Sequence, residues 1–457
     1  MGSALALNIE EHGFPIAVWN HEPDRTEVFA SQNRQRRVLG AATLEEFAAA
    51  LAPPRRILLM ITAGAPVDQM IERLSPLLAP GDVLIDGGNS HFRDTARRQE
   101  LLAGRGVDFL GLGVSGGEAG ARRGPSLMAG GRREAYDTVR DVLEAIAAPT
   151  DRGTAAAWLG PGAAGHLVKM VHNGIEYGDL QAIAEAYDLL HRAGGLEAPQ
   201  VGGIFADWDR GPLGSLLVEI TARVLARLDD ATGQPLVDMI VDEAGQKGTG
   251  RWTIELAAEM GVPAPTMTAA VDARLLSSLR AERIALSERL PGARANPPAP
   301  DRGRLAASVA DALLASRVCA LAQGFRLIRH AGTELGWAID PRSVAGVWRA
   351  GCIIQSRVMD RLLAAYERDP ELEHLFFDED IAATLDQAQA GWRETVALAI
   401  AREIPVPAIS ASLAYYDAYR SARLPQNLLQ AQRDYFGAHK YVRIDHPELG
   451  PVHTDWE

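Results

Sequence analysis

The sequence is poor in several features that would assign a protein to a class. It has only two cysteines, Cys319 and Cys352, too few for a disulfide framework or a cysteine-ligated metal cluster. Its net charge is −13 and no dense block of Lys and Arg stands out, which argues against a nucleic-acid partner or an anionic membrane surface. No uncharged apolar run reaches the length of a bilayer span, and residues 1–13 lack the basic leader of a secretion signal. His, Cys and Asp do not cluster at metal-ligand spacing. We therefore expect a cytoplasmic protein with no nucleic-acid or membrane partner and no bound metal.

Short apolar runs alternate with helical patterns up to about residue 160. The runs typical of buried strands, each leading into a loop with Gly or Asn, are 14–20, 56–64, 82–90 and 107–117. Helical patterns such as 43–52 and 66–78 lie between them. This alternation predicts a parallel sheet with crossover helices, in which ligands bind at the carboxyl ends of the strands.

Strand patterns nearly vanish after residues 153–166. Long Ala/Leu-rich amphipathic runs then continue to about residue 420, broken by Pro/Gly loops such as 291–304. From residue 421 the chain is polar and aromatic, with little periodicity after QAQRDYF, which we expect to form a turn. The sequence predicts three parts: a sheet domain at 1–163, an all-helical domain at 164–421 and a C-terminal tail at 422–457.

The stretch HLVKMVHNGIEYGD (166–179) has the period of a helix. Its apolar side would carry Leu167, Val168, Met170, Val171 and Ile175, and its opposite side Lys169, His172, Asn173 and Glu176, with Tyr177 at the edge. One interpretation is an amphipathic surface helix whose polar side faces water. The other is a catalytic face with an ammonium, an imidazole, an amide and a carboxylate in line.

Several loops carry residues that suit a small anionic ligand. Ser115, Gly116 and Gly117 follow an apolar strand in the loop 114–131, and Asn89 ends DGGNS. Glycines there let backbone N–H groups approach an anion. Lys247 and Thr249 lie in QKGTG, and Arg274 lies in ARLLSSLRAER. Each has an ordinary explanation as a turn, a surface loop or a solvated charge, but their joint occurrence favours a site.

Taken in order, the longer motifs resemble decarboxylating 6-phosphogluconate dehydrogenases. The motifs are DGGNS, VSGGEAGARRGPSLM, VKMVHNGIEYGD, AGQKGTGRWT, ARLLSSLRAER, WRAGCIIQS and QAQRDYFGAH. The similarity covers the whole chain, and QAQRDYFGAH distinguishes this family from the shorter 3-hydroxyisobutyrate dehydrogenases. The resemblance implies an α/β Rossmann-like dinucleotide-binding domain, a large all-α substrate and dimerisation domain, and an extended C-terminal tail.

The resemblance also implies roles for the candidate residues. Lys169 would be the general base for the C3 hydroxyl of 6-phosphogluconate, and Glu176 the acid that protonates C1 of the enediol to give ribulose 5-phosphate. The implied substrate-binding residues are Asn89, Ser115, Gly116, Gly117, His172, Asn173, Tyr177, Lys247, Thr249 and Arg274. Arg433 and His439 of the tail would complete the site of the other subunit, which implies a homodimer.

The implied cofactor is NADP or NAD. The residues implied to bind it are Met1, Gly2, Asn20, His21, Glu22, Ile61, Thr62, Ala63 and Asn89. The family opens with a strand and a turn G-L-x-x-M-G, whereas Met1 and Gly2 correspond to the last two residues of that turn. A first, central strand would thus be missing, and we expect that translation starts upstream.

The cofactor's ribose site also departs from the family. The family usually has Asn-Arg-Thr after its second strand, where this chain has Asn20, His21 and Glu22. Thr62 stands where a lysine is common, and Arg25 is the nearest remaining cation. Since a carboxylate here accepts hydrogen bonds from the ribose of NAD, Glu22 favours NAD.

Two alternative functions stay open at this point. One is a 3-hydroxyacid dehydrogenase that does not decarboxylate, against which the phosphate-binding residues and the tail argue. The other is a non-catalytic sugar-phosphate-binding protein with a damaged cofactor site, against which the complete catalytic set argues.

Overall fold

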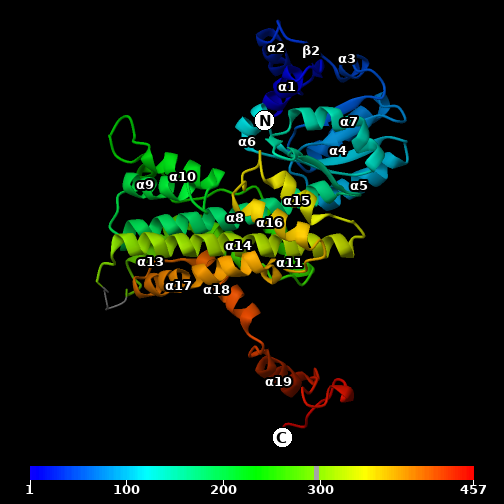
Figure 1. Ribbon diagram of the computed structural model, residues 1–457. Coiled ribbons are helices and arrows are strands. Elements are labelled where there is room, and N and C mark those ends of the chain that lie inside the picture. Colours follow the sequence, from blue (N-terminus) through cyan, green and yellow to red (C-terminus); the bar gives the residue numbers. More distant parts are fainter. Residues whose placement is uncertain (293–297) are drawn as a thin grey trace. The chain divides into compact units, whose positions relative to one another are not determined.

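The computed structural model describes residues 1–292 and 298–457 and divides into two compact units, 1–412 and 413–457. Each unit is described by itself. The predicted Pro/Gly loop 291–304 lies partly outside the described residues. The chain begins with a three-layer arrangement of helices and strands and continues as an assembly of long helices (Figure 1).

The middle layer of this arrangement is a five-stranded sheet with the strand order β3-β4-β5-β6-β9. Its strands are β3 (Arg56–Leu59), β4 (Val83–Asp86), β5 (Asp108–Ser115), β6 (Ser126–Gly130) and β9 (Ala156–Gly160). β3, β4 and β5 are parallel, as predicted, but β6 is antiparallel to β5. The loop expected at 114–131 contains β6 and the short helix α6 (Gly117–Arg123). A parallel return needs a crossover of a dozen or more residues, and the connection through α6 is shorter.

Helices cover both faces of this sheet. The covering helices are α1 (Gly2–Glu11), α3 (Leu44–Ala49), α4 (Ala65–Leu74), α5 (Phe92–Ala103) and α7 (Arg133–Ile146). Successive side chains of β4 enter different cores, because Val83 and Ile85 pack with α1 and α7 whereas Leu84 packs with α4 and α5. Strands buried on both faces explain why these segments are continuously apolar in the sequence.

Two further strands form a separate parallel pair. They are β1 (Ile16–Val18) and β2 (Val38–Gly40), with α2 (Pro23–Gln32) between them. Among the described residues, β2 is the only strand that pairs with β1, and β4 is the only strand that pairs with β3. β1 and β3 are therefore not paired with each other in the described part of the chain.

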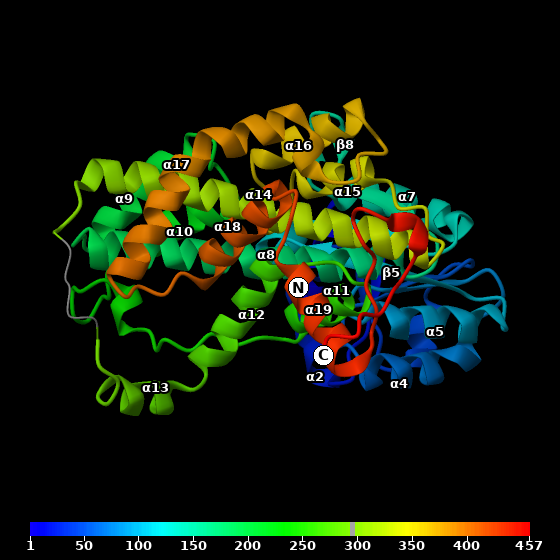
Figure 2. The same cartoon turned by 90° about the horizontal axis from the view of Figure 1, so that it is seen from below.

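In the described part of residues 164–412 the regular elements are helices, with isolated β-bridges between Ser215 and Ser356 and between Leu228 and Pro235, as the all-helical prediction requires. The long helices are α8 (Ala164–Asp188), α14 (Arg302–Glu334) and α17 (Glu379–Ala401); α8 and α14 run side by side (Figures 1 and 2). The shorter helices are α9 (Ala198–Asp209), α10 (Leu216–Ala226), α11 (Thr249–Glu259), α12 (Pro265–Ser277), α13 (Arg280–Ser287), α15 (Pro341–Trp348), α16 (Val358–Arg368) and α18 (Pro407–Arg420). By length and composition α14 could cross a membrane, yet 72% of its apolar window is buried inside the protein, as in the core helix of a soluble protein.

The start of α8 presses directly against the sheet. A Cβ atom on Gly165 would lie 2.3 Å from the Met128 carbonyl oxygen and 2.4 Å from that of Gly111. A Cβ on Gly113 would lie 2.5 Å from Cβ of Lys169. Glycine is thus required on both sides of this contact, which fixes where Lys169 stands relative to the ends of the strands.

A buried carboxylate organises the second unit, 413–457. Asp434, on α19 (Gln426–Gly437), accepts hydrogen bonds from Lys440 N at 2.8 Å, His453 Nδ1 at 3.0 Å, Thr454 N at 3.1 Å and Trp456 Nε1 at 2.9 Å. Burial alone would raise the pKa of Asp434, but hydrogen bonds from His453, Thr454 and Trp456 together lower it. The stretch QAQRDYF, expected to form a turn, is helical; Gln, Ala, Leu and Arg are good helix formers.

The contact at Gly165 predicts a large cost for any side chain there. Gly165→Ala should lower the free energy of unfolding by at least about 2 kcal/mol, because the backbone of two strands must move to admit a methyl group. Urea unfolding followed by circular dichroism measures this. Gly203→Ala in α9 is the matched control, since a Cβ there meets no atom within 4 Å; it should stabilise the protein by up to about 1 kcal/mol. Equal effects of the two changes would contradict our account of the contact.

Candidate active site

One chain of polar contacts joins the middle of α8 to the end of β5. Lys169 Nζ lies 2.5 Å from Asn173 Oδ1 and 3.5 Å from His172 Nδ1. His172 Nε2 lies 3.2 Å from Ser115 Oγ, and Asn173 Nδ2 donates to Thr249 Oγ1 at 3.0 Å. The structure therefore gathers five of the residues predicted from separate parts of the sequence.

The polar side of α8 is buried rather than solvated. Lys169 is 6% exposed, His172 0% and Asn173 8%. A surface helix would leave such side chains in water, so that interpretation of the amphipathic pattern is wrong. Polar groups taken out of water without a full set of partners are characteristic of functional sites.

Burial shifts the ionisation of this row in one consistent sense. It lowers the pKa of Lys169 below its ordinary value, although the Glu176 carboxylate acts in the opposite direction. It raises the pKa of Glu176, opposed by the charges of Lys169 and Arg274. Burial and the charge of Lys169 together lower the pKa of His172 well below its usual range. Each group is thereby shifted toward its neutral form.

A second group of residues lies toward the far end of the row. The Arg274 guanidinium stacks on the Tyr177 ring, with Cζ 3.6 Å from the ring centroid. The ring also packs on Gly250, where a Cβ would lie 2.5 Å from Tyr177 Cδ2. Gly250 follows Thr249 at the start of α11, and Lys247 is exposed just before it. Two cations and a hydroxyl near one point can bind a phosphate.

The turn after β5 has the backbone conformation that the glycine pair suggested. Gly116 has φ 113° and Gly117 has φ 64°. A Cβ on Gly116 would also come within 2.5 Å of the Gly351 carbonyl oxygen. Ser115 accepts a long hydrogen bond from Ile353 N, at 3.4 Å. The turn is thus held against residues 351–353, beside His172.

Asn89 and Lys169 line the same small cavity. The cavity's other lining residues are Ser90, His166, Met170, Asn173 and Thr249. We did not predict His166 or Ser90 as site residues. His166 precedes Lys169 by three positions, so extending the helical period back by one turn would have found it. Its Nδ1 lies 2.7 Å from Thr95 Oγ1, whereas its buried Nε2 has no hydrogen-bond partner among the described residues.

The predicted cofactor residues of the sheet domain lie at the expected edge. Ile61, Thr62 and Ala63 follow β3, which is adjacent to β4 and its Asn89 loop. A Cβ on Gly2 would lie 3.4 Å from Cβ of Met60, so the first turn of α1 adjoins this loop. That turn has no side-chain cap, and uncapped amides there suit a phosphate. The residues present fit a dinucleotide.

At the predicted ribose position Glu22 and Arg25 form an ion pair. Arg25 Nε lies 2.7 Å from Glu22 Oε2, and His21 Nε2 lies 3.5 Å from Glu22 Oε1. Asn20 Oδ1 accepts from Glu22 N at 3.0 Å, which shapes the turn into α2. The side chains of His21, Glu22 and Arg25 are all exposed.

The two tail residues belong to the second unit. Arg433 Nη1 donates to Gln430 Oε1 at 3.0 Å. His439 lies between Ala438 and Lys440, which have φ values of 49° and 60°. Such left-handed conformations are unusual for residues other than glycine, and the Asp434 hydrogen bonds hold this turn. In the described residues no group of three or more His, Cys, Asp and Glu is arranged to hold a metal ion.

Comparison with known proteins assigns the family. A family model described as the C-terminal domain of 6-phosphogluconate dehydrogenase matches residues 165–456, and one described as the NAD binding domain of 6-phosphogluconate dehydrogenase matches residues 1–160. The chain belongs to the 6-phosphogluconate dehydrogenase family. The fold prediction of a Rossmann-like domain followed by a large helical domain is thereby confirmed.

Individual family members are similar over their whole length. The decarboxylating 6-phosphogluconate dehydrogenase of Synechococcus elongatus is 50% identical, over 100% of this chain and 97% of that protein. The NADP(+)-dependent, decarboxylating enzyme of Bacillus subtilis is 46% identical, again over 100% and 97%. The Plasmodium falciparum enzyme, solved in its apo form and with NADP+ or 6-phosphogluconate, has a TM-score of 0.96 and 41% identity, over 100% of this chain and 98% of that one.

Proposed function

We propose that this protein catalyses the oxidative decarboxylation of 6-phosphogluconate to ribulose 5-phosphate and CO2, with reduction of NADP or NAD. The row of Lys169, His172, Asn173 and Glu176, buried at its first three members, lies beside a group suited to a phosphate and carries the proposal, together with the family membership. Incubation with 6-phosphogluconate and each nucleotide tests it, by absorbance of the reduced nicotinamide and by release of CO2. Cytoplasmic location and the domain limits 163/164 and 421/422 stay predictions.

Lys169 is the proposed general base. It removes the proton of the C3 hydroxyl, for which it must be neutral, and burial lowers its pKa in that direction. Once protonated, its ammonium hydrogen-bonds the C3 carbonyl oxygen, where negative charge develops as the carboxylate leaves. The nucleotide, when bound, supplies the acceptor for the hydride of C3.

The remaining residues hold the substrate along α8. Ser115, Gly116, Gly117 and His172 face its carboxylate, and Asn89 and Asn173 bind its hydroxyls. Tyr177, Lys247, Thr249 and Arg274 bind its phosphate. The stacked Tyr177 and Arg274 and the exposed Lys247 support the phosphate end. Thr249 also accepts from Asn173, so it links the phosphate and hydroxyl groups of the site.

Glu176 is the proposed acid that protonates C1 of the enediol. It lies seven positions after Lys169, about 10 Å along the helix at ~1.5 Å rise per residue. Its raised pKa favours the protonated form that this step requires. The distance keeps acid and base at opposite ends of the reacting carbons.

A homodimer in which Arg433 and His439 act on the partner's substrate site completes the proposal. Unit 413–457 leaves many apolar side chains unburied within itself: Leu424, Leu428, Leu429, Tyr435, Phe436, Val442 and Ile444. The first unit also exposes Ile220 and Val224 of α10 and Leu275, Leu276 and Leu279 around the end of α12. Exposed apolar sets of this size support association with a second copy.

Glu176→Gln should reduce turnover by about 10²-fold or more, because the amide cannot donate a carboxylic proton. In the unmodified enzyme we expect a bell-shaped pH profile of kcat. Activity falls at low pH as Lys169 gains a proton, and at high pH as Glu176 loses one. The variant should lose the alkaline limb, because its amide has no proton to lose, and its remaining acid limb should report the titration of Lys169 alone.

Asp188→Asn is the control for this change. It neutralises a carboxylate at the end of the same helix, which pairs with Arg192, and should leave the profile unchanged. A Glu176→Gln enzyme with turnover within a few-fold of the unmodified enzyme would remove Glu176 from the acid role.

Mixing two inactive variants tests the exchange of tail residues. Lys169→Ala and Arg433→Ala proteins, combined after subunit exchange, should regain about a quarter of full activity. Half of randomly formed dimers are mixed, and each mixed dimer has one intact site. If mixed dimers form without recovery, Arg433 acts within its own chain.

Cofactor preference tests the ribose site. We expect NAD to be used at least as well as NADP, because Glu22 repels a 2′-phosphate and His21 replaces a bidentate arginine. His21→Arg should raise kcat/KM for NADP about tenfold or more, since a charge-assisted fork contributes ~1.5 to 3 kcal/mol. Steady-state kinetics with both nucleotides measure this. A preference for NADP above about tenfold in the unmodified enzyme would mean that Arg25 leaves Glu22 to bind the phosphate.

A further inference from the structure

Two loops meet in direct contact at the carboxyl edge of the sheet. One follows β3 at residues 60–64, and the other follows β4 at residues 87–91. Gly87 N donates to the Leu59 carbonyl oxygen at 2.9 Å, continuing the ladder past the strand ends. A Cβ on Gly88 would lie 3.1 Å from the Ile61 carbonyl oxygen. A shift of either loop therefore displaces the other.

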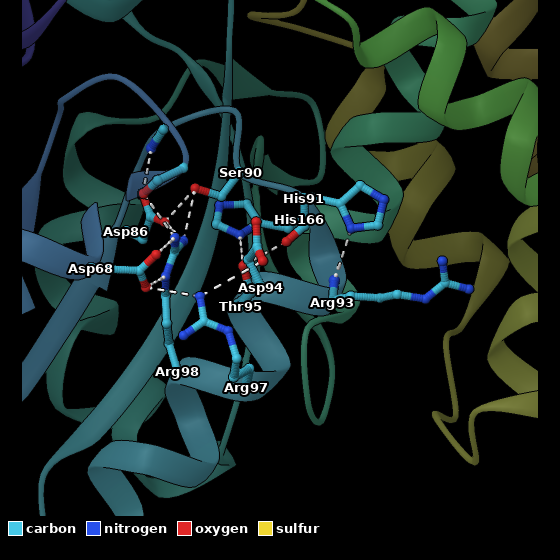
Figure 3. A network of polar contacts seen from close by, with 12 residues as sticks. Asp68, Asp86, Ser90, His91, Arg93, Asp94, Thr95, Arg97, Arg98 and His166 are labelled. Atoms are coloured by element: carbon cyan, nitrogen blue, oxygen red, sulfur yellow. Dashed lines mark hydrogen bonds and ion pairs between the residues drawn. The ribbon is translucent and has the colours of Figure 1, made fainter. Parts of the chain in front are cut away.

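The buried guanidinium of Arg98, on α5, contacts both loops. Its Nη2 donates to the Gly64 carbonyl oxygen at 3.0 Å, at the end of the first loop. Its Nη1 lies 3.4 Å from Ser90 Oγ in the second loop and 3.5 Å from Asp86 Oδ2 at the end of β4, where that loop begins. Figure 3 shows the side chain reaching between Asp68 and Asp86.

The remaining donors of Arg98 bind the carboxylate of Asp68, on α4. Nε and Nη2 donate to the two carboxylate oxygens of Asp68, at 2.8 and 3.1 Å. Every N–H of the fork thus has an acceptor within 3.5 Å, and the Arg98 side chain is fully buried. Lysine has three donors and no planar fork, so it could not replace this set.

The second loop is tied down on both sides of Asn89. Asp86 Oδ2 accepts from Ser90 Oγ at 2.6 Å, and Asp86 Oδ1 accepts from Gly88 N at 3.0 Å. Within residues 86–90 all are buried except Asn89, which projects from the edge. The network therefore fixes the backbone on either side of a side chain that lines the cavity of Lys169.

Stability alone is a weak reason for such a group. A buried ion pair often contributes no more than apolar residues of the same volume would. A planar fork that joins two loops and a helix instead restricts their relative geometry, and active sites need such support around the groups that touch substrate.

We propose that Arg98 is a positioning residue that holds the loop 60–64 and the Asn89 loop in one fixed arrangement for the nucleotide and the sugar acid. The inference rests on the proposed function. Its distinguishing feature is that one substitution, remote from both ligands, affects the binding of both.

Arg98→Lys tests the proposal, with Arg97→Lys as the matched control. Arg97 is the preceding residue of α5 and pairs with the same Asp68 from a half-exposed position. Arg98→Lys should raise both the KM for 6-phosphogluconate and the Kd for NADPH, measured by its fluorescence, with kcat/KM falling about 10- to 100-fold. Arg97→Lys should leave these constants within about twofold of the unmodified enzyme.

The thermal midpoint separates positioning from stability. If Arg98→Lys lowers only the midpoint and both constants stay within about twofold, the proposal is wrong. Should that variant not fold, Ser90→Ala decides, because it removes one link between the Asn89 loop and Arg98 and keeps every charge. The proposal then requires a rise of about threefold or more in the KM for 6-phosphogluconate, and unchanged constants overturn it. An unmodified enzyme that neither binds NADPH nor oxidises 6-phosphogluconate would refute the proposed function itself.

Discussion

The close packing of α8 on the sheet is the constraint on which the site depends. Gly165 on the helix, with Gly111 and Gly113 on β5, allows backbones to approach where no side chain fits. Because α8 starts there and packs against both the sheet and α14, Lys169, His172 and Asn173 on its polar side are buried. The same contact fixes the height of Lys169 above the strand ends, and hence its place beside Ser115 and Asn89.

Burial then prepares Lys169 and Glu176 for the roles proposed for them. A charged ammonium and a charged carboxylate lose hydration in the same enclosed row, so the neutral lysine and the protonated glutamate are favoured together. The pair holds one proton either way, and its titration belongs to the pair rather than to one residue. Burial of this row therefore has two effects: it lowers the pKa of Lys169 and raises the pKa of Glu176.

The sequence predicted what is periodic or carried by a long motif. The apolar runs predicted β3, β4 and β5, and the helical period of residues 166–179 predicted the polar row of α8. β6 was missed altogether, because residues 114–131 were expected to form a loop. Its antiparallel direction follows from the length of one connection and not from its composition. Whether the polar row met water or protein also could not be read from α8 alone, since the answer lies in Gly111 and Gly113, on another element.

Residues that act through contacts left even less trace in the sequence. Arg98 is one of several arginines on an ordinary-looking helix, and only its five acceptors distinguish it from Arg97 next to it. His166 was within reach of the helical period. The roles proposed for Arg433 and His439 came from resemblance alone, since nothing in the composition of a polar tail indicates such a role.

The Asp434 carboxylate has a consequence for how the tail can vary in sequence. A segment of 45 residues (413–457) is too short to build a sizeable apolar core. One acidic side chain instead ties it together by accepting from four donors, at Lys440 and in residues 453–456. Two of those donors are backbone amides, which any residue but proline supplies. The other two come from the side chains of His453 and Trp456, so the hydrogen bonds of this carboxylate constrain three side-chain positions of the tail: Asp434, His453 and Trp456.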